Sequence, residues 1–101
     1  MTNTLIDLVF HASDTVDDDD RTVSDILHYA YTEMGELAEE HIIEQGRSYK
    51  NAGPDGVVGE AMDAILCLLD IIHVHSPELT SVDLEHIAIH KINKWLDSKL
   101  P

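Results

Sequence analysis

The stretch VVGEAMDAILCLLDIIHVH, residues 57–75, is apolar on nearly every side of a helix. A helix that is apolar all round belongs inside a bundle, so this stretch predicts the central helix of an all-α fold. Its polar residues are the exception to that pattern. Glu60, Asp63 and Asp70, with Cys67 between them, follow steps of three, four and three, which place them on one narrow seam.

An acidic seam on such a helix is energetically costly. Buried carboxylates need a hydrogen bond, a counter-charge or a metal ion to offset the loss of hydration. The chain has 20 acidic and only 6 basic residues, for a formal net charge of -14, so few side chains can neutralise the seam. A bound divalent cation would supply the missing positive charge.

A second acidic seam occurs on the helix that we expect before the central one. Glu33, Glu36 and Glu40 share a face there, beside the apolar stripe of that helix. If the two helices pair antiparallel, Glu33 and Glu36 converge with Glu60 and Asp63. Four oxygen donors without a neighbouring His or Cys suit Mg²⁺ or Mn²⁺ better than zinc.

The apolar periodicity predicts a single all-helical domain over residues 1–101, with a four-helix-bundle-like protomer. Thr22 or Ser24 can cap the second helix, Ser81 is a candidate cap for the last one, and residues 13–20 are expected to form an acidic loop. No alternating strand pattern competes with the helices. The expected helices cover about residues 3–12, 22–45, 57–75 and 81–99.

Composition excludes several classes of function. The negative charge argues against a nucleic-acid polymer as partner, because phosphate contacts need clustered Lys and Arg. We expect no signal peptide and no membrane span, and the single Cys67 fits a reduced, cytoplasmic protein. A small chain with such apolar helices is also expected to bury part of its surface against copies of itself, as a homodimer or homotetramer.

The two acidic pairs also carry a family resemblance. Glu33-x-x-Glu36 within EMGELA and Glu60-x-x-Asp63 within EAMDAIL resemble the ExxE and ExxD motifs of the all-α nucleoside triphosphate pyrophosphatase superfamily. That superfamily includes MazG, the dimeric dUTPases and phosphoribosyl-ATP pyrophosphohydrolase. The resemblance covers roughly residues 24–95, which is most of the chain.

The resemblance implies cleavage of a nucleoside triphosphate to the monophosphate and pyrophosphate. Glu33, Glu36, Glu60 and Asp63 would then hold Mg²⁺, and either Glu36 or Glu40 would accept a proton from the attacking water.

Family members often meet the outer phosphates with basic or amide side chains of the last helix. Lys91, Asn93 and Lys94 occupy a similar place here, without the arginines that many relatives have. Arg47 and Lys50, in the loop before the central helix, are further candidates for binding the substrate. Each of these cations also has an ordinary interpretation as a solvated surface residue.

Two other interpretations stay open. The first alternative is an enzyme like phosphoribosyl-ATP pyrophosphohydrolase, with a different substrate. The second is a non-catalytic helical interaction module whose acids merely keep it hydrated. Tyr31 and Trp95 are candidates to stack on a base, although Trp95 lies on an apolar stripe that favours packing in the core. The histidines lack a third ligand at a spacing suited to zinc.

Overall fold

The computed structural model describes residues 4–16 and 21–99, and every element in these ranges is an α-helix. The expected all-α class and the number of helices are confirmed. The bounds of the second, third and fourth helices lie within one residue of those that the sequence predicts. The helices are α1 (Thr4–Thr15), α2 (Val23–Glu44), α3 (Gly56–His75) and α4 (Ser81–Lys99).

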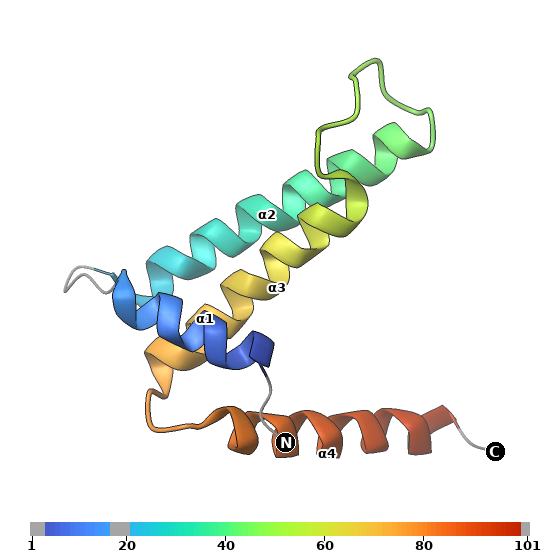
Figure 1. Cartoon of the computed structure of the whole chain (residues 1–101). Helices are drawn as coiled ribbons and strands as arrows, with labels where there is room; N and C mark the ends of the chain where they lie inside the picture. The colour runs from blue at the N-terminus through green and yellow to red at the C-terminus, as the bar shows by residue number, and fades with distance from the viewer. Residues whose placement is uncertain (1–3, 17–20, 100–101) are drawn as a thin grey trace.

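Helices α2 and α3 pack side by side in opposite directions and form the long arm of the molecule (Figure 1). The side chains of Ile26, Ala30 and Ala64 are buried between them, each with no more than 5% of its surface exposed. The two alanines are small, so the backbones can approach closely where the helices cross. This close pairing brings the acidic seams of α2 and α3 together.

The start of α2 is fixed by a capping box, as the sequence allowed. The Thr22 hydroxyl accepts from the Asp25 backbone N–H at 3.2 Å, and the Thr22 N–H donates back to Asp25 Oδ2 at 3.3 Å. Each bond satisfies a backbone group that the helix leaves without an internal partner. At the same end of the arm, α3 stops at Ser76, just before Pro77, where the sequence predicts its end.

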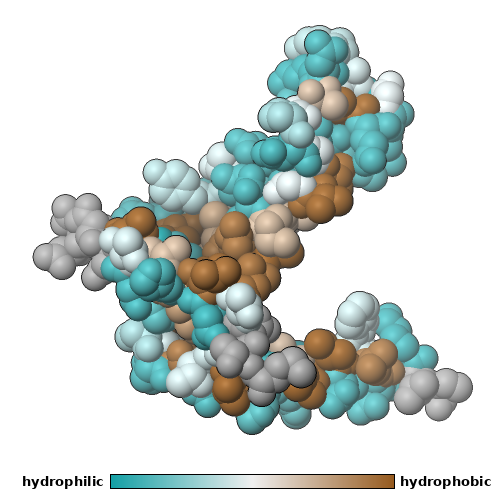
Figure 2. All heavy atoms as spheres, viewed as in Figure 1, coloured by the Kyte–Doolittle hydropathy of each residue, from teal (hydrophilic) through white to brown (hydrophobic). Residues whose placement is uncertain are grey.

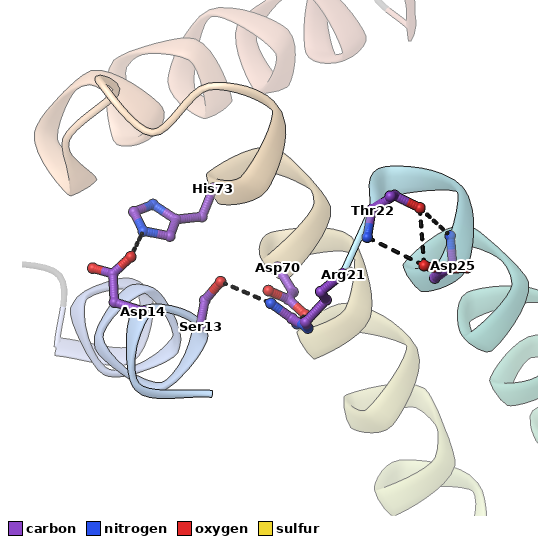
Figure 3. A network of polar contacts seen from close by, with 7 residues as sticks. All are labelled: Ser13, Asp14, Arg21, Thr22, Asp25, Asp70 and His73. Carbon is purple, nitrogen blue, oxygen red and sulfur yellow. Dashed lines mark hydrogen bonds and ion pairs between the residues drawn. The ribbon is translucent and has the colours of Figure 1, made fainter. Parts of the chain in front are cut away.

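Helix α1 crosses the lower end of α3 and ends three residues later than predicted, at Thr15 instead of Ala12. The reason is tertiary: Ser13 is buried against α3, and Asp14 Oδ1 lies 2.7 Å from His73 Nε2 in a hydrogen bond (Figure 3). The ring of His73 also stacks on Phe10, with 4.4 Å between the ring centroids. The remainder of the expected acidic loop, residues 17–20, lies outside the described residues.

The last helix begins with a cap that differs from the expected one. The sequence suggested Ser81, but Thr80 forms the capping box, with its hydroxyl accepting from the Asp83 N–H at 3.1 Å and its own N–H donating to Asp83 Oδ2 at 3.0 Å. These hydrogen bonds hold the pKa of the Asp83 carboxyl below its ordinary value. The box therefore works best with an ionised Asp83.

Within one chain the four helices do not form the closed bundle that the sequence suggested. Only the first turn of α4 is anchored, through Leu84, which joins Ile6 and Phe10 in a buried core beside Leu69 and Ile72. Beyond this turn α4 extends away from the arm and leaves an open angle (Figure 1).

Apolar residues are exposed along the extended part of α4 and on the flank of α3 that borders this angle (Figure 2). Trp95, expected in the core, is 66% exposed. The apolar stripe of α4 is therefore unburied in the single chain. In the described ranges, no helix is both long and apolar enough to cross a membrane.

The contact between α1 and α3 can be tested with a pair of variants. Phe10→Ala removes a ring that is 8% exposed, and we expect the free energy of unfolding to fall by about 3 kcal/mol, because a large core side chain leaves a cavity. Leu8→Ala is the control, since Leu8 lies on the same helix but is 60% exposed. Urea denaturation followed by circular dichroism measures both, and equal losses would contradict the packing described.

Candidate metal centre

Five carboxylates from α2, α3 and the residue before α3 gather on the arm. One carboxylate oxygen from each of Glu33, Glu36 and Glu60 lies within 4.8 Å of the other two, and the same holds for Asp55, Glu60 and Asp63. Glu60 belongs to both groups and joins them into one site. We call these five residues the carboxylate cluster.

The structure thus brings together the four acids that the sequence singled out as metal ligands. Glu33 and Glu36 come from α2, and Glu60 and Asp63 come from the facing turn of α3. Because residues three apart lie on the same side of a helix, each ExxE or ExxD pair presents two carboxylates to the partner helix. The antiparallel pairing of α2 and α3 supplies the rest of the geometry.

Asp55 is a member of the cluster that was not predicted, because it falls in the loop before the central helix, where no helical spacing groups it with the other acids. Gly56 follows it with φ of 64°, a left-handed conformation that favours glycine and starts α3 from a sharp bend. A Cβ on Gly59 would lie only 2.4 Å from the Asp55 Cβ, so a glycine is required for Asp55 to fold against the first turn. The sequence did contain a signal for this arrangement, namely an acid followed by two glycines at the start of a helix.

The cluster favours protonation of its two central acids. The pKa of Glu33 is raised above its ordinary value by desolvation and then by the charges of Glu36 and Asp63. The pKa of Glu60 is raised by desolvation and then by its acidic neighbours, of which Glu36 contributes most. Each shift means that the folded protein disfavours the charged carboxylate, first because it is desolvated and then because its neighbours carry the same charge.

Positive charge is what the cluster lacks. Of the ion pairs formed by the described residues, none includes a member of the cluster. Within residues 4–16 and 21–99, Glu33 Oε2 and Glu60 Oε2 are buried and have no hydrogen-bond partner. Buried acceptors without donors are uncommon in folded proteins because they lose hydration without compensation. Divalent cations would pair with both the charge and the unused oxygens.

The structure does not bring Glu40 into the cluster. Its side chain is 8% exposed, and its two carboxylate oxygens accept from the Gly53 backbone N–H at 2.9 and 3.2 Å. Glu40 thus anchors the loop that connects α2 to α3. Of the two candidate general bases, Glu36 is in the cluster and is exposed, whereas Glu40 is engaged elsewhere.

The candidate phosphate-binding residues also lie away from the cluster in this chain. Lys91, Asn93 and Lys94 are exposed on the part of α4 that extends from the arm. In the loop, Arg47 is exposed, and Lys50 Nζ donates to Glu39 Oε1 at 2.8 Å, outside the cluster. One chain alone therefore surrounds the carboxylates with none of the cations that the sequence analysis proposed.

A polar network that the sequence did not indicate lies farther along the same seam of α3. Arg21 is paired with Asp70 and also donates to Ser13 Oγ at 3.4 Å, as Figure 3 shows. Both charged side chains are mostly buried, with 21% and 17% of their surfaces exposed. Asp70 thus receives a counter-charge from the chain itself, unlike the acids of the cluster.

Comparison of the chain with family models, with curated proteins and with solved structures finds no match. The carboxylate cluster and the two sequence motifs are therefore the features of this chain that bear on its function.

The raised pKa of Glu60 predicts a pH-dependent stability in metal-free protein. An acid whose folded pKa is raised contributes stability below its ordinary value of 4.5 and loses it as the pH rises through the folded pKa. Glu60→Gln removes the charge, so it should raise the melting temperature at pH 8 but have little effect near pH 4. Thermal unfolding in a chelating buffer measures the difference, with Glu44→Gln, at the exposed end of α2, as the control. If Glu60→Gln raised the melting temperature equally at both pH values, the charge of Glu60 would not be the cause of the gain.

Proposed function

We propose that this chain is a Mg²⁺-dependent nucleoside triphosphate pyrophosphohydrolase of the MazG-like superfamily, which converts a ribo- or deoxyribonucleoside triphosphate to the monophosphate and pyrophosphate. The observation that carries the proposal is the carboxylate cluster, with its unused buried oxygens and its lack of a protein cation. The spacing of the two motifs supports it, since both acidic pairs resemble those of the superfamily.

The donor set fits magnesium. All five members of the cluster offer carboxylate oxygens, which are the ligands preferred by hard cations such as Mg²⁺ and Mn²⁺. Cys67 lies one turn beyond Asp63, and burial raises the pKa of its thiol, so it remains protonated and is a poor ligand. Glu33, Glu36, Glu60 and Asp63 would hold the ions, with Asp55 as an additional ligand through the group that it shares with Glu60.

The ions, when bound, would neutralise phosphate charge and lower the pKa of an attacking water. Glu36 is exposed at the edge of the cluster, where it can accept the proton of that water. The water oxygen bonds to one phosphorus of the α–β anhydride, the bond from that phosphorus to the bridging oxygen breaks, and the nucleoside monophosphate and pyrophosphate are the two products. Glu33 and Glu60 are placed deeper and would position the ions.

Self-association is the second part of the proposal. The chain exposes 7602 Å², about 1,900 Å² more than the roughly 5,700 Å² expected for a compact monomer of 11.3 kDa. Its radius of gyration of 16.3 Å likewise exceeds the roughly 13 Å of a compact chain of this length. A standard interface removes roughly 800 Å² from each partner, so the excess matches the needs of a dimer or tetramer.

A second copy would also complete the active site. The cations of α4 lie away from the carboxylates of their own chain, so Lys91, Asn93 and Lys94 would reach the substrate phosphates at the site of a neighbouring copy. Arg47 and Lys50 lie in the loop between α2 and α3 and would serve either copy. The unburied stripe of α4 provides the contact between the copies.

The catalytic proposal predicts the loss of activity on removing one carboxylate. Glu36→Gln and Asp63→Asn should lower Mg²⁺-dependent release of pyrophosphate from nucleoside triphosphates by about 100-fold or more, because each removes a ligand or the general base. A coupled pyrophosphate assay measures this, and circular dichroism confirms that the helices persist. Glu44→Gln is the matched control and should keep full activity.

Calorimetry with Mn²⁺ separates the enzyme from a non-catalytic helical module. The enzyme should bind the ion saturably and gain thermal stability from it, and both effects should weaken in Asp63→Asn. A chain that shows neither metal binding nor turnover would contradict the proposed function.

The oligomer predicts a change in solution mass on altering the stripe of α4. Ile92 is 49% exposed in the single chain, so Ile92→Glu should leave the helices intact but reduce the mass to the 11.3 kDa of one chain, because a charge cannot be buried at an apolar contact. His90→Glu places the same charge on the opposite side of α4 and should keep the oligomer. Sedimentation velocity measures both, and a wild-type monomer would contradict this part of the proposal.

A further inference from the structure

A cavity lies beside the carboxylate cluster, on the side of the arm that leads toward α1. It measures about 690 Å³ and lies between the first turns of α2 and the middle of α3. The residues that line it include Tyr29, which is 67% exposed, together with Asp25, Asp70 and Arg21. It therefore offers a flat aromatic surface together with hydrogen-bond donors and acceptors.

The cavity continues the cluster along both helices. On α2, Tyr29 precedes Glu33 by one turn on the same face, and on α3, Cys67 follows Asp63 by one turn. One turn advances a helix by about 5.4 Å. The charges of Glu33 and Asp63 also contribute to the raised pKa of the Cys67 thiol, which agrees with this closeness. A molecule whose phosphates sit at the cluster would extend directly into the cavity.

The Arg21–Asp70 pair lines the cavity at the end that lies away from the cluster. Both residues also line a second, smaller cavity of about 260 Å³ on the side of α1, so the pair stands between the two spaces. The bond from Arg21 to Ser13 Oγ ties this wall to α1 (Figure 3). Asp70 follows Asp63 by seven residues, so the wall stands roughly 10 Å from the cluster along α3.

We propose that this cavity receives the base and sugar of the substrate, and that the Arg21–Asp70 pair limits the base to the size of an unsubstituted purine or pyrimidine. The inference rests on the proposed function, because it assumes that phosphates bind at the cluster. Tyr29 stacks on the base, and the polar groups of Asp25 and Arg21 accept from and donate to its edge. A nucleotide with a large group on its base meets the wall.

The first test compares two probes in the presence of Mn²⁺, measured by calorimetry: α,β-methylene-ATP, which resists hydrolysis between these phosphates, and inorganic tripolyphosphate, which has no nucleoside. Wild-type protein should bind the nucleotide analogue more tightly than tripolyphosphate. Tyr29→Ala should weaken the binding of the analogue by about tenfold through the loss of stacking. The affinity for tripolyphosphate should stay unchanged. Tyr31, which the sequence offered as a candidate for stacking, lies on another face of α2, is 69% exposed and does not line the cavity. Tyr31→Ala is therefore the matched control and should alter neither affinity.

The second test removes the wall. Arg21→Ala combined with Asp70→Ala deletes both charges together, so that neither is left buried alone. The ratio of affinities between α,β-methylene-ATP and the same analogue with a benzyl group on its base should fall by about tenfold in this variant, because the two cavities join. Glu44→Ala combined with Lys99→Ala removes one acid and one cation from exposed positions outside the cavity and should keep the wild-type ratio.

The outcomes separate the two proposals. Equal binding of both phosphate probes, with no effect of Tyr29→Ala, would overturn this inference and leave the metal centre in place. An unchanged ratio in a wall variant that keeps its helices by circular dichroism would overturn the role of Arg21 and Asp70. Binding of neither probe would overturn the proposed function and this inference with it. Tyr29 is exposed, so its variant tests the cavity even if the wall variant does not fold.

Discussion

The pairing of α2 with α3 is the constraint on which the rest of the structure depends, because it brings two acidic seams face to face. The buried contacts of Ile26, Ala30 and Ala64 favour the pairing, whereas the repulsion within the carboxylate cluster opposes it. Apolar burial is non-directional and cannot choose where carboxylates meet, so their meeting has to be tolerated or compensated. A bound cation would replace the repulsion between the carboxylates by attraction to the ion, and the cluster would then stabilise the pairing of α2 with α3. The ion would in this way link the stability of the fold to the proposed activity.

At the opposite end of the arm, charged side chains are compensated within the chain. Arg21 pairs with Asp70, and Asp14 with His73, so both contacts tie the first part of the chain to α3. The contrast between the two ends is informative. The same helix carries an acid that the protein neutralises itself and acids that it leaves unpaired, and the cavity lies between them. A substrate with an anionic end and a neutral planar end matches this polarity.

The open shape follows from the way in which the core is divided. Ile6, Phe10 and Leu84 make a small core at the base of the arm, and the apolar stripe of α4 beyond it contributes nothing to the single chain. A chain of 101 residues with such a small core would be marginally stable alone. The surface that binds a neighbouring copy and the surface that completes the site would then be the same, so assembly and catalysis are expected to depend on each other.

By itself, the sequence determined what is local: the four helices, a cap at Thr22 or Ser24, the stop before Pro77, and two pairs of acids on single helix faces, since these depend on periodicity and on neighbours three or four residues apart. Tertiary structure decided what depends on distant contacts. It extended α1 through the bonds of its last turn to α3, brought Asp55 to Glu60 over a glycine bend, and used Glu40 to anchor a loop. It also left α4 unpacked, because periodicity shows that a face is apolar but does not show which surface covers it.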